Sequence, residues 1–272
     1  VKCCVVNARM TEKSFQRYQK RAALFSSVFN QLCWVGCQTE ADCRRYLALG
    51  SPRVETVGNV KFELTLPPSL KQDSKNLGLS LVNERPIWMA ASVLPGEFEM
   101  LLAAHQRVLT HIPDALLVLL PRHPERFAQI ADYLSSNHIS YVKRSLASQV
   151  AHEQVWLADT MGEALAFYQL AHIAFVGGSL VDVGGHNPLE PAALGKPIIM
   201  GPHYVNCIES VELLVTGGGL KLLDEPSAIA AQVKEWFQND SAIQRAGSSN
   251  RRVIEANKGA LSLSQKAISG LL

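Results

Sequence analysis

Four turns in this 272-residue sequence contain the residue types that could bind an anion or a sugar. Each turn follows a short apolar run and leads into an amphipathic stretch, which is the pattern of a strand, a turn and a helix start. In open α/β sheets, ligands bind beyond the carboxyl ends of the strands, at turns of this kind. The four turns cover residues 91–97, 121–127, 159–163 and 177–191.

The turn over 177–191 is the richest of the four. Its four glycines lack a Cβ, so the backbone can approach a phosphate or a sugar closely. The segment 187–190 predicts a helix start with Asn187 at N-cap, Pro188 at N1 and Glu190 at N3, whose free N–H groups favour an anion. Glu190 has two open interpretations: a capping-box carboxylate, or an acceptor for the vicinal hydroxyls of a ribose. The glycines are Gly177, Gly178, Gly184 and Gly185.

The other turns supply charged side chains and backbone groups. Arg122 closes an apolar strand, and its guanidinium suits a phosphate or a carboxylate. The alternative for Arg122 is a surface ion pair with Glu125 or another acid nearby. Met161 is more typical of packing, although backbone groups of its turn could read a base edge. Glu163 is also explained as an acid favoured by the helix dipole at a helix start.

Motifs for several other chemistries are absent from the sequence. There is no G-x-G-x-x-G after the first strand, no G-x-x-x-x-G-K-[ST] loop, no G-x-S-x-G and no H-E-x-x-H. The six cysteines form no C-x-x-C pair, and no matching histidine spacing accompanies them. Hydride transfer, P-loop phosphoryl transfer and zinc hydrolysis are therefore disfavoured, and neither a metal nor a cofactor is expected.

Alternating strands and helices must position these turns. The run 115–120 is apolar at every position, as parallel strands covered on both faces are. The alternation predicts an α/β fold with a doubly wound parallel sheet. Predicted strands cover 1–6, 33–37, 54–57, 86–91, 115–120, 154–157, 172–176, 197–200 and 219–223. Predicted helices cover 12–28, 39–48, 97–110, 124–136, 160–170, 187–194, 206–215, 227–238 and 240–256.

Composition and length limit the possible functions. A chain that is 47% hydrophobic and 18% charged is typical of a compact globular protein, and its length indicates about two domains. A net charge of +2 gives no general reason to expect nucleic acid. Residues 1–60 nevertheless carry nine Lys and Arg against four Asp and Glu. This basic segment could face an anionic membrane surface or ligand, or could be an ordinary solvated helix face.

The strand and helix pattern also predicts how the chain divides. Residues 1–58 contain too few strand–helix units for a complete α/β domain, so we expect them to be the last part of one. Residues 59–256 form a complete second domain, and 257–272 a C-terminal helix that packs back on the N-terminal part. The sequence has no initial Met and begins directly as a buried strand, so we expect an upstream part to be missing.

The motifs in these turns resemble those of the Kdo transferase family, whose members move 3-deoxy-D-manno-octulosonic acid (Kdo) from CMP-Kdo to a lipid A precursor. The combination of Asp159-Thr-Met-Gly-Glu163 with the glycine-rich run is the most specific part of the resemblance. The segments that carry it are 6–10, 90–92 with 96–97, 121–127, 159–163, 175–180 and 184–190.

The resemblance implies a GT-B glycosyltransferase that inverts configuration and needs no metal. By position, CMP contacts fall on Pro121, Arg122, Met161, Gly162, Glu163, Asn187, Pro188, Leu189 and Glu190. The donor end of the nucleotide sugar falls on Ser92, Gly96, Gly177, Gly178 and Ser179. Many relatives have Ser-Thr-His in the first turn, whereas this chain has Ser92-Val-Leu94, so a contact from that histidine is in doubt.

The same resemblance implies partners and a location. The family's catalytic glutamate and its membrane anchor are expected upstream of Val1, so this chain is expected to bind CMP without carrying the base. The intact protein is expected at the cytoplasmic face of the bacterial inner membrane, with a lipid A precursor as acceptor and no nucleic acid. Two alternatives stay open: a GT-B transferase or epimerase using a UDP-sugar, and a non-catalytic nucleotide-binding module.

Overall fold

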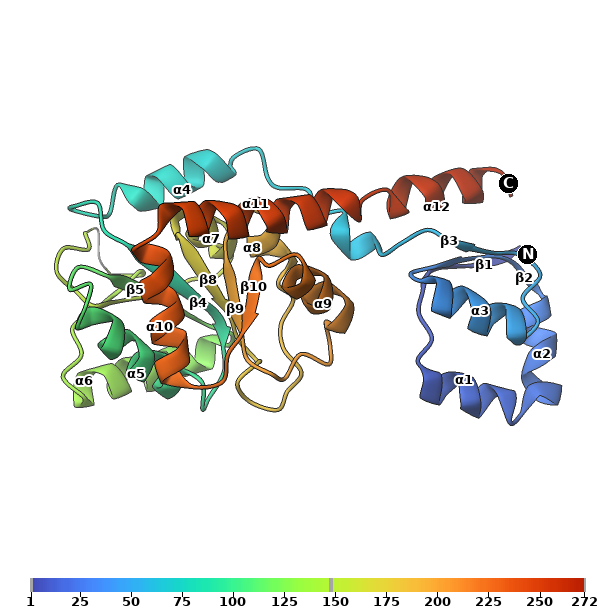
Figure 1. Ribbon diagram of the computed structural model, residues 1–272, viewed down its shortest axis with the longest axis horizontal. Coiled ribbons are helices and arrows are strands. Elements are labelled where there is room, and N and C mark those ends of the chain that lie inside the picture. Colours follow the sequence, from blue (N-terminus) through green and yellow to red (C-terminus); the bar gives the residue numbers. More distant parts are fainter. Residues whose placement is uncertain (1, 147–148, 272) are drawn as a thin grey trace. The chain divides into compact units, whose positions relative to one another are not determined.

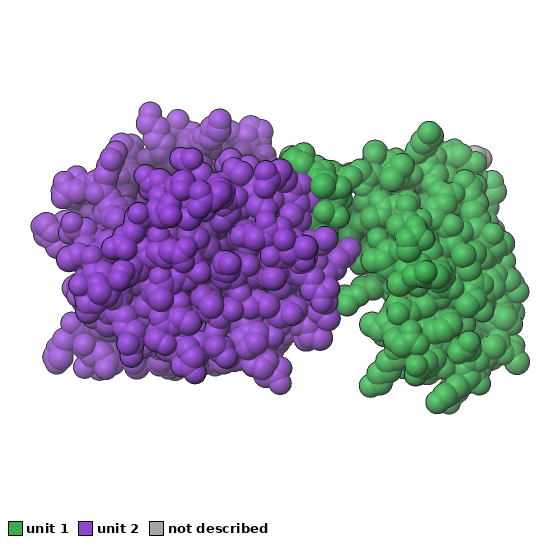
Figure 2. Space-filling model, viewed as in Figure 1, with its two compact units in different colours: residues 1–65, 254–272 green, residues 66–253 purple. Residues whose placement is uncertain are grey.

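The structure, a computed structural model, describes residues 2–146 and 149–271 and divides into two compact units (Figure 2). The larger unit comprises residues 66–253, and the smaller unit comprises residues 1–65 together with 254–272. We predicted boundaries after residues 58 and 256, whereas the contacts divide the chain after Thr65 and after Val253.

The larger unit is built around a seven-stranded sheet among its described residues, with the order β10-β9-β8-β4-β5-β7-β6. Every neighbouring pair in it is parallel. The α/β fold with a parallel sheet predicted from the sequence is therefore confirmed. The strands are β4 (Ile87–Val93), β5 (Leu116–Pro121), β6 (Tyr141–Lys143), β7 (Val155–Leu157), β8 (Ile173–Val176), β9 (Ile198–Met200) and β10 (Leu220–Leu222).

Helices cover both faces of this sheet (Figure 1). Successive side chains of β4 point to opposite faces, so Trp88 and Ala90 pack with α5, α6 and α10, whereas Ile87 and Met89 pack with α4 and α7. This double burial explains why a central strand such as β5 is apolar at every position. The helices are α4 (Leu70–Gly78), α5 (Phe98–Leu109), α6 (Phe127–Ser136), α7 (Ala164–Leu170), α8 (Leu189–Ala193), α9 (Ile208–Thr216), α10 (Pro226–Phe237) and α11 (Asp240–Ala256).

The strand order reverses between β4 and β8. After β4 the chain adds β5 on one side, then β6 at the edge and β7 between β5 and β6. It then crosses to the other side of β4 to add β8, β9 and β10. The two connections that leave β4 and β8 therefore diverge to opposite sides at their carboxyl ends. A crevice at such a reversal is where open α/β sheets bind ligands.

The smaller unit has a parallel sheet in the order β1-β2-β3. Its C-terminal part is held by Glu63, whose Oε1 accepts hydrogen bonds from the N–H groups of Gly259 (2.6 Å) and Leu261 (3.3 Å) at the start of α12. The elements are β1 (Cys3–Ala8), α1 (Glu12–Gln19), α2 (Ala22–Asn30), β2 (Leu32–Cys37), α3 (Glu40–Ala48), β3 (Val54–Thr56), the 3₁₀ turn η1 (Val60–Phe62) and α12 (Ala260–Ser269).

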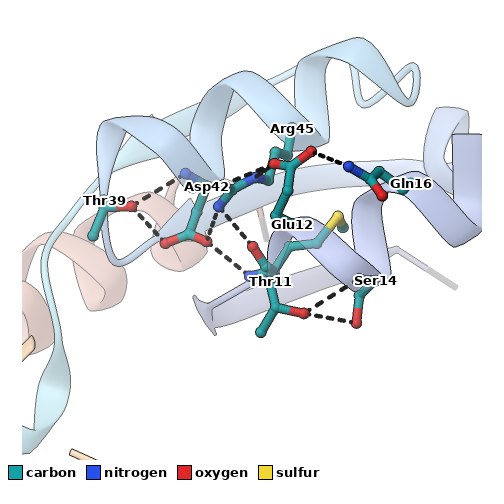
Figure 3. A network of polar contacts seen from close by, with 8 residues as sticks. Thr11, Glu12, Ser14, Gln16, Thr39, Asp42 and Arg45 are labelled. Atoms are coloured by element: carbon teal, nitrogen blue, oxygen red, sulfur yellow. Dashed lines mark hydrogen bonds and ion pairs between the residues drawn. The ribbon is translucent and has the colours of Figure 1, made fainter. Parts of the chain in front are cut away.

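A polar network fixes the loop that follows β1 (Figure 3). Asp42, only 3% exposed, accepts hydrogen bonds from the N–H of Met10 (2.8 Å) and from Thr39 Oγ1 (2.6 Å). Arg45 donates to the carbonyl of Met10 at 2.8 Å. The network holds the backbone next to Arg9, whose exposed guanidinium forms no hydrogen bond or ion pair with the residues described.

The single helix predicted over 12–28 is wrong, because the structure has two helices there. Tyr18 packs edge-on against Phe25 with ring centroids 4.8 Å apart. Seven residues of a straight helix rise about 10 Å, so these rings could not meet without a break. The break falls at Arg21, whose φ of −123° is not helical.

One strand and one α-helix of the described structure were not predicted, nor was the 3₁₀ turn η1. The strand β6 and the helix α4 are absent from the expected elements. The remaining strands lie within about two residues of their predicted positions, which is the usual uncertainty at element ends. No helix in the described parts of the chain is long and apolar enough to cross a bilayer.

Candidate functional site

One buried carboxylate, that of Glu97, joins the loops that follow β4 and β8. Its Oε2 accepts hydrogen bonds from the N–H groups of Leu94 (2.9 Å) and Gly178 (2.7 Å). Its Oε1 accepts from those of Ser179 and Leu180, each at 2.9 Å. Glu97 is 0% exposed, and a buried carboxylate is tolerated when donors of this kind surround it.

The amides of the glycine-rich loop are thus occupied within the protein. We expected the backbone at Gly177 and Gly178 to approach a phosphate, but Gly177 N–H donates to the carbonyl of Ala91 at 2.8 Å and Gly178 N–H to Glu97. Gly177 instead permits close contact between strand ends, because a Cβ there would lie 2.5 Å from the carbonyl oxygen of Ser92. These two amides are not free for a ligand.

Ser179 is also turned into the protein. Its side chain is 0% exposed, and its Oγ donates to the carbonyl of Val176 (2.6 Å) and accepts from the N–H of Gly201 (2.9 Å). The structure therefore does not present the Ser179 hydroxyl to a ligand. Ser92 (φ 57°) and Gly96 (φ 90°), on the opposite loop, are half-buried and exposed respectively.

Arg122 follows β5 with its side chain exposed. Its backbone N–H donates to the carbonyl of Val93 at 3.0 Å, which fixes it beside the end of β4. Within residues 2–146 and 149–271 its guanidinium has no hydrogen bond or ion pair. The alternative ion pair with Glu125 is absent, and Glu125 instead lies 3.9 Å from His123 Nδ1. Pro121, the last residue of β5, is buried.

The segment after the glycine-rich loop begins its helix later than predicted. Asn187 Oδ1 accepts from the N–H of Leu189 at 3.2 Å, and α8 starts at Leu189 with Pro188 as its N-cap. Glu190 is therefore not at N3, and the capping box is not formed. Pro188 and Leu189 are buried, whereas Asn187 is exposed. With only five residues, α8 offers little of the helix dipole that we expected to favour an anion.

The Glu190 carboxylate is half-buried and forms no hydrogen bond or ion pair with the described residues. Burial raises the pKa of Glu190 above its ordinary value. Partial burial of a carboxylate without a partner costs free energy, and a ligand that donates hydrogen bonds to it would reduce that cost. This feature favours the second interpretation of Glu190, as an acceptor for ligand hydroxyls.

The third turn is anchored by an ion pair that the sequence did not reveal. Glu163 Oε1 accepts from Arg144 Nη2 at 3.0 Å, and Glu163 Oε2 accepts from the hydroxyl of Thr160. Both oxygens of the Glu163 carboxylate therefore already accept hydrogen bonds within the protein. Met161 is 68% exposed, and Gly162 has a φ of 84° with no atom near its missing Cβ. These two residues are open to solvent beside β7.

His186 lies within the electrostatic influence of Arg122. Burial first, and then the charge of Arg122, lower the pKa of His186 below its ordinary value. The Nε2 atom of His186 is buried and has no hydrogen-bond partner among the residues that the structure describes. No group of three or more His, Cys, Asp or Glu side chains that could hold a metal occurs in the part of the chain that the structure describes.

Glu97 and Arg144 are the site residues that the sequence analysis missed. Glu97 stands directly before an apolar helix run, where an acid is commonly explained by the helix dipole alone. Its real partners include residues 178–180, which are distant in sequence. Arg144 lies just beyond the short strand β6, which was not predicted, so no signal marked its position.

Comparison with known proteins relates the chain to one transferase family. A family model described as 3-deoxy-D-manno-octulosonic-acid transferase (kdotransferase) matches residues 1–64. A 3-deoxy-D-manno-octulosonic acid transferase from Haemophilus influenzae is 37% identical over 262 residues, which cover 94% of this chain and 61% of the relative. A relative of the same name from Bordetella pertussis is 31% identical over 235 residues, 84% of this chain and 54% of the relative.

Solved structures agree with the fold. The C-terminal CMP-Kdo binding domain of WaaA from Acinetobacter baumannii has a TM-score of 0.63 and 28% identity, covering 68% of this chain and 97% of that domain. HepE from Anabaena, solved with UDP and glucose, has a TM-score of 0.51 and 13% identity, covering 99% of this chain and 71% of that one. The second likeness concerns the fold alone.

Proposed function

Because the chain belongs to the 3-deoxy-D-manno-octulosonic acid (Kdo) transferase family, we propose that it is a glycosyltransferase that moves Kdo from CMP-Kdo to a lipid A precursor in lipopolysaccharide synthesis. The chain spans 61% of the length of its Haemophilus influenzae relative, so the proposal concerns the protein as a whole. In this proposal the transfer inverts the anomeric configuration and needs no metal ion, and the larger unit binds the nucleotide.

The observation that supports a nucleotide site most directly is a pair of unpartnered charges at the switch point. Arg122 follows β5, and Glu190 belongs to the connection that follows β8. Both strands are neighbours of β4, so the two residues are carried on either side of it. A free guanidinium suits the phosphate of CMP, and a free carboxylate suits the two ribose hydroxyls.

The same arrangement gives Arg122 a role in the chemistry. When CMP leaves the anomeric carbon of Kdo, negative charge develops on the departing phosphate. A positive group already fixed at that position lowers the barrier, because it does not have to reorganise during the reaction. The hydrogen bond from Arg122 N–H to Val93 fixes the backbone from which the guanidinium extends.

A comparison of CMP with UDP tests the proposal. A ligand that binds the folded protein raises its unfolding midpoint, so CMP should stabilise the chain in a thermal-shift assay and UDP at the same concentration should not. HepE, at 13% identity, was solved with UDP, and its likeness does not decide which nucleobase this chain binds. UDP is therefore the informative nucleotide to compare with CMP. Stabilisation by UDP alone would favour a UDP-sugar enzyme and would remove the Kdo proposal.

We also propose that the smaller unit faces an anionic lipid surface, at the cytoplasmic face of the bacterial inner membrane. Lys13, Arg17, Lys20 and Arg21 are exposed on and after α1, and none forms an ion pair with a described residue. Exposed Leu24 (66%) follows on α2. Basic side chains beside exposed apolar ones suit an anionic bilayer surface.

Neutralising the four basic residues is therefore expected to abolish most binding to anionic vesicles. Each basic residue near such a surface contributes about 1 kcal/mol, so the fourfold Gln variant should bind far more weakly in co-sedimentation. Added salt should weaken the wild-type chain in the same way. Binding that resists both salt and the four substitutions would contradict this proposal.

A further inference from the structure

A continuous path of hydrogen bonds runs from Arg122 to the segment that carries Glu190. Arg122 N–H donates to the carbonyl of Val93, and the neighbouring Leu94 N–H donates to Glu97. Glu97 accepts from Gly178 N–H at 2.7 Å. The path continues beyond Gly178 in the glycine-rich loop. Glu97 is thus the side chain that links the loops after the paired strands β4 and β8, beyond the last backbone bond between them, from Gly177 N–H to the carbonyl of Ala91.

The rest of the path consists of backbone bonds within one connection. Gly178 O accepts from the N–H of Gly185 at 2.7 Å, and Gly177 O accepts from that of His186 at 3.0 Å. His186 is followed directly by the segment 187–190. The position of Glu190 relative to β4 therefore depends on how the loop 177–180 is held.

The usual role of an acid before a helix does not account for Glu97. An acid that acts through the helix dipole lies near the exposed first turn, whereas Glu97 is fully buried. None of its four acceptor bonds goes to an N–H of α5, since all four donors lie in the loops at residues 94 and 178–180. Three of these donors are amides of the glycine-rich loop, so Glu97 makes them unavailable to an anionic ligand.

We propose that Glu97 is a positioning residue for nucleotide binding: its carboxylate holds the loop after β8 against the loop after β4 and so sets the Glu190 segment relative to Arg122. The inference rests on the proposed function, since it takes CMP as the ligand. Glu97 itself does not touch the nucleotide.

Glu97→Gln tests this role with little change in size. Each carboxylate oxygen accepts two N–H groups, so a side-chain NH₂ at either place faces two donors and loses both bonds. The bonds lost are those between the charged Glu97 and the loop amides, and such bonds are strong. Because the loop then holds the Glu190 segment less well, we expect about a tenfold loss of CMP affinity by calorimetry. Glu99→Gln is the matched control, because it removes the same charge from the start of α5 and breaks no hydrogen bond of a described residue.

A merely structural Glu97 would give a different result. Glu97→Gln would then lower the unfolding midpoint and leave the CMP affinity of the folded protein unchanged, which would overturn the inference. If Glu97→Gln does not fold, Glu97→Asp replaces it: the carboxylate is kept but is one methylene too short to reach both loops, and the same loss of affinity is expected.

Hydrogen exchange separates this inference from the proposed function. In the unliganded wild-type chain, the amides of Gly178, Ser179 and Leu180 should exchange slowly, because all three donate to a buried carboxylate. If these amides exchange as fast as those of an exposed loop, Glu97 does not hold the loop after β8, whether or not CMP binds. Slow exchange without any CMP binding would show that Glu97 holds the loop but has no role in nucleotide binding. The proposed function would then fail for a separate reason.

Discussion

Replacing Arg122 with alanine is expected to weaken CMP binding by about a hundredfold, because a guanidinium can give a phosphate two charge-assisted hydrogen bonds. The exposed Arg122 side chain has no partner among the described residues, so its loss removes no bond from the folded state. The unfolding midpoint without ligand should therefore stay where it is. Calorimetry with CMP and a thermal scan without it measure the two effects separately.

Arg126→Ala is the matched control for this experiment. Arg126 is exposed on the same connection after β5, and its guanidinium donates to Gln129 within the protein. It was not predicted to touch the nucleotide, so its removal should leave the CMP affinity unchanged. Equal losses for both variants would point to a general charge effect. An unaltered affinity in Arg122→Ala would remove Arg122 from the site.

Glu190→Gln is expected to change affinity and stability in opposite directions. The variant should bind CMP between about tenfold and thirtyfold more weakly, because the amide is a poorer acceptor for two ribose hydroxyls. Without CMP it should unfold at a temperature higher by about 2 °C, because a half-buried charge without a partner has been removed. Exposed Glu225, at the N-cap of α10, is the control, and Glu225→Gln should not raise the midpoint.

The raised pKa of Glu190 adds a dependence on pH. The folded state binds the proton of Glu190 more readily than the unfolded chain, so its contribution to stability is greatest at acid pH and is lost as the pH rises through the folded pKa. The difference in unfolding midpoint between Glu190→Gln and the wild-type chain should therefore grow from acid to neutral pH. CMP affinity should fall as the pH drops through the same pKa, and the fall should be smaller in Glu190→Gln, which has no carboxyl group at this position to protonate.

Sequence patterns located the central strands of the larger unit well because nearly all of their side chains are buried. Runs such as 115–120 are apolar at every position, and the structure places β5 at Leu116–Pro121. The strand β6 was not predicted because it is a half-buried edge strand of three residues that ends in a lysine. The helix α4 was not predicted because it buries few apolar side chains, among them Leu70 and Leu77, and directly follows two prolines at 67–68.

The candidate site was only partly accessible to sequence reasoning. The turns could be found, because strand ends followed by glycine, proline and charged residues are a local signal. Which turns lie side by side depends on the strand order, and the pairing of β4 with β8 joins segments more than 80 residues apart. For this reason Glu97 could not be recognised as the partner of the loop amides, and Gly177 and Gly178 were expected to serve a ligand.

The structure also shows why the helix start at 187–190 was placed too early. Asn187 has the side chain of a helix cap, and its Oδ1 does accept a backbone N–H, but that of Leu189 two residues on. Such short bonds compete with helix formation and are equally typical of turns. The spacing of Asn187 and Glu190 could not distinguish the two, so the free carboxylate became visible only in the structure.

A crystal structure of this chain with CMP tests the central claim most directly. The account predicts the nucleotide at the carboxyl ends of β4, β5 and β8, with its phosphate within hydrogen-bonding distance of the Arg122 guanidinium and its ribose hydroxyls on the Glu190 carboxylate. CMP bound elsewhere on the larger unit, or bound here with both of these groups turned away from it, would contradict the account.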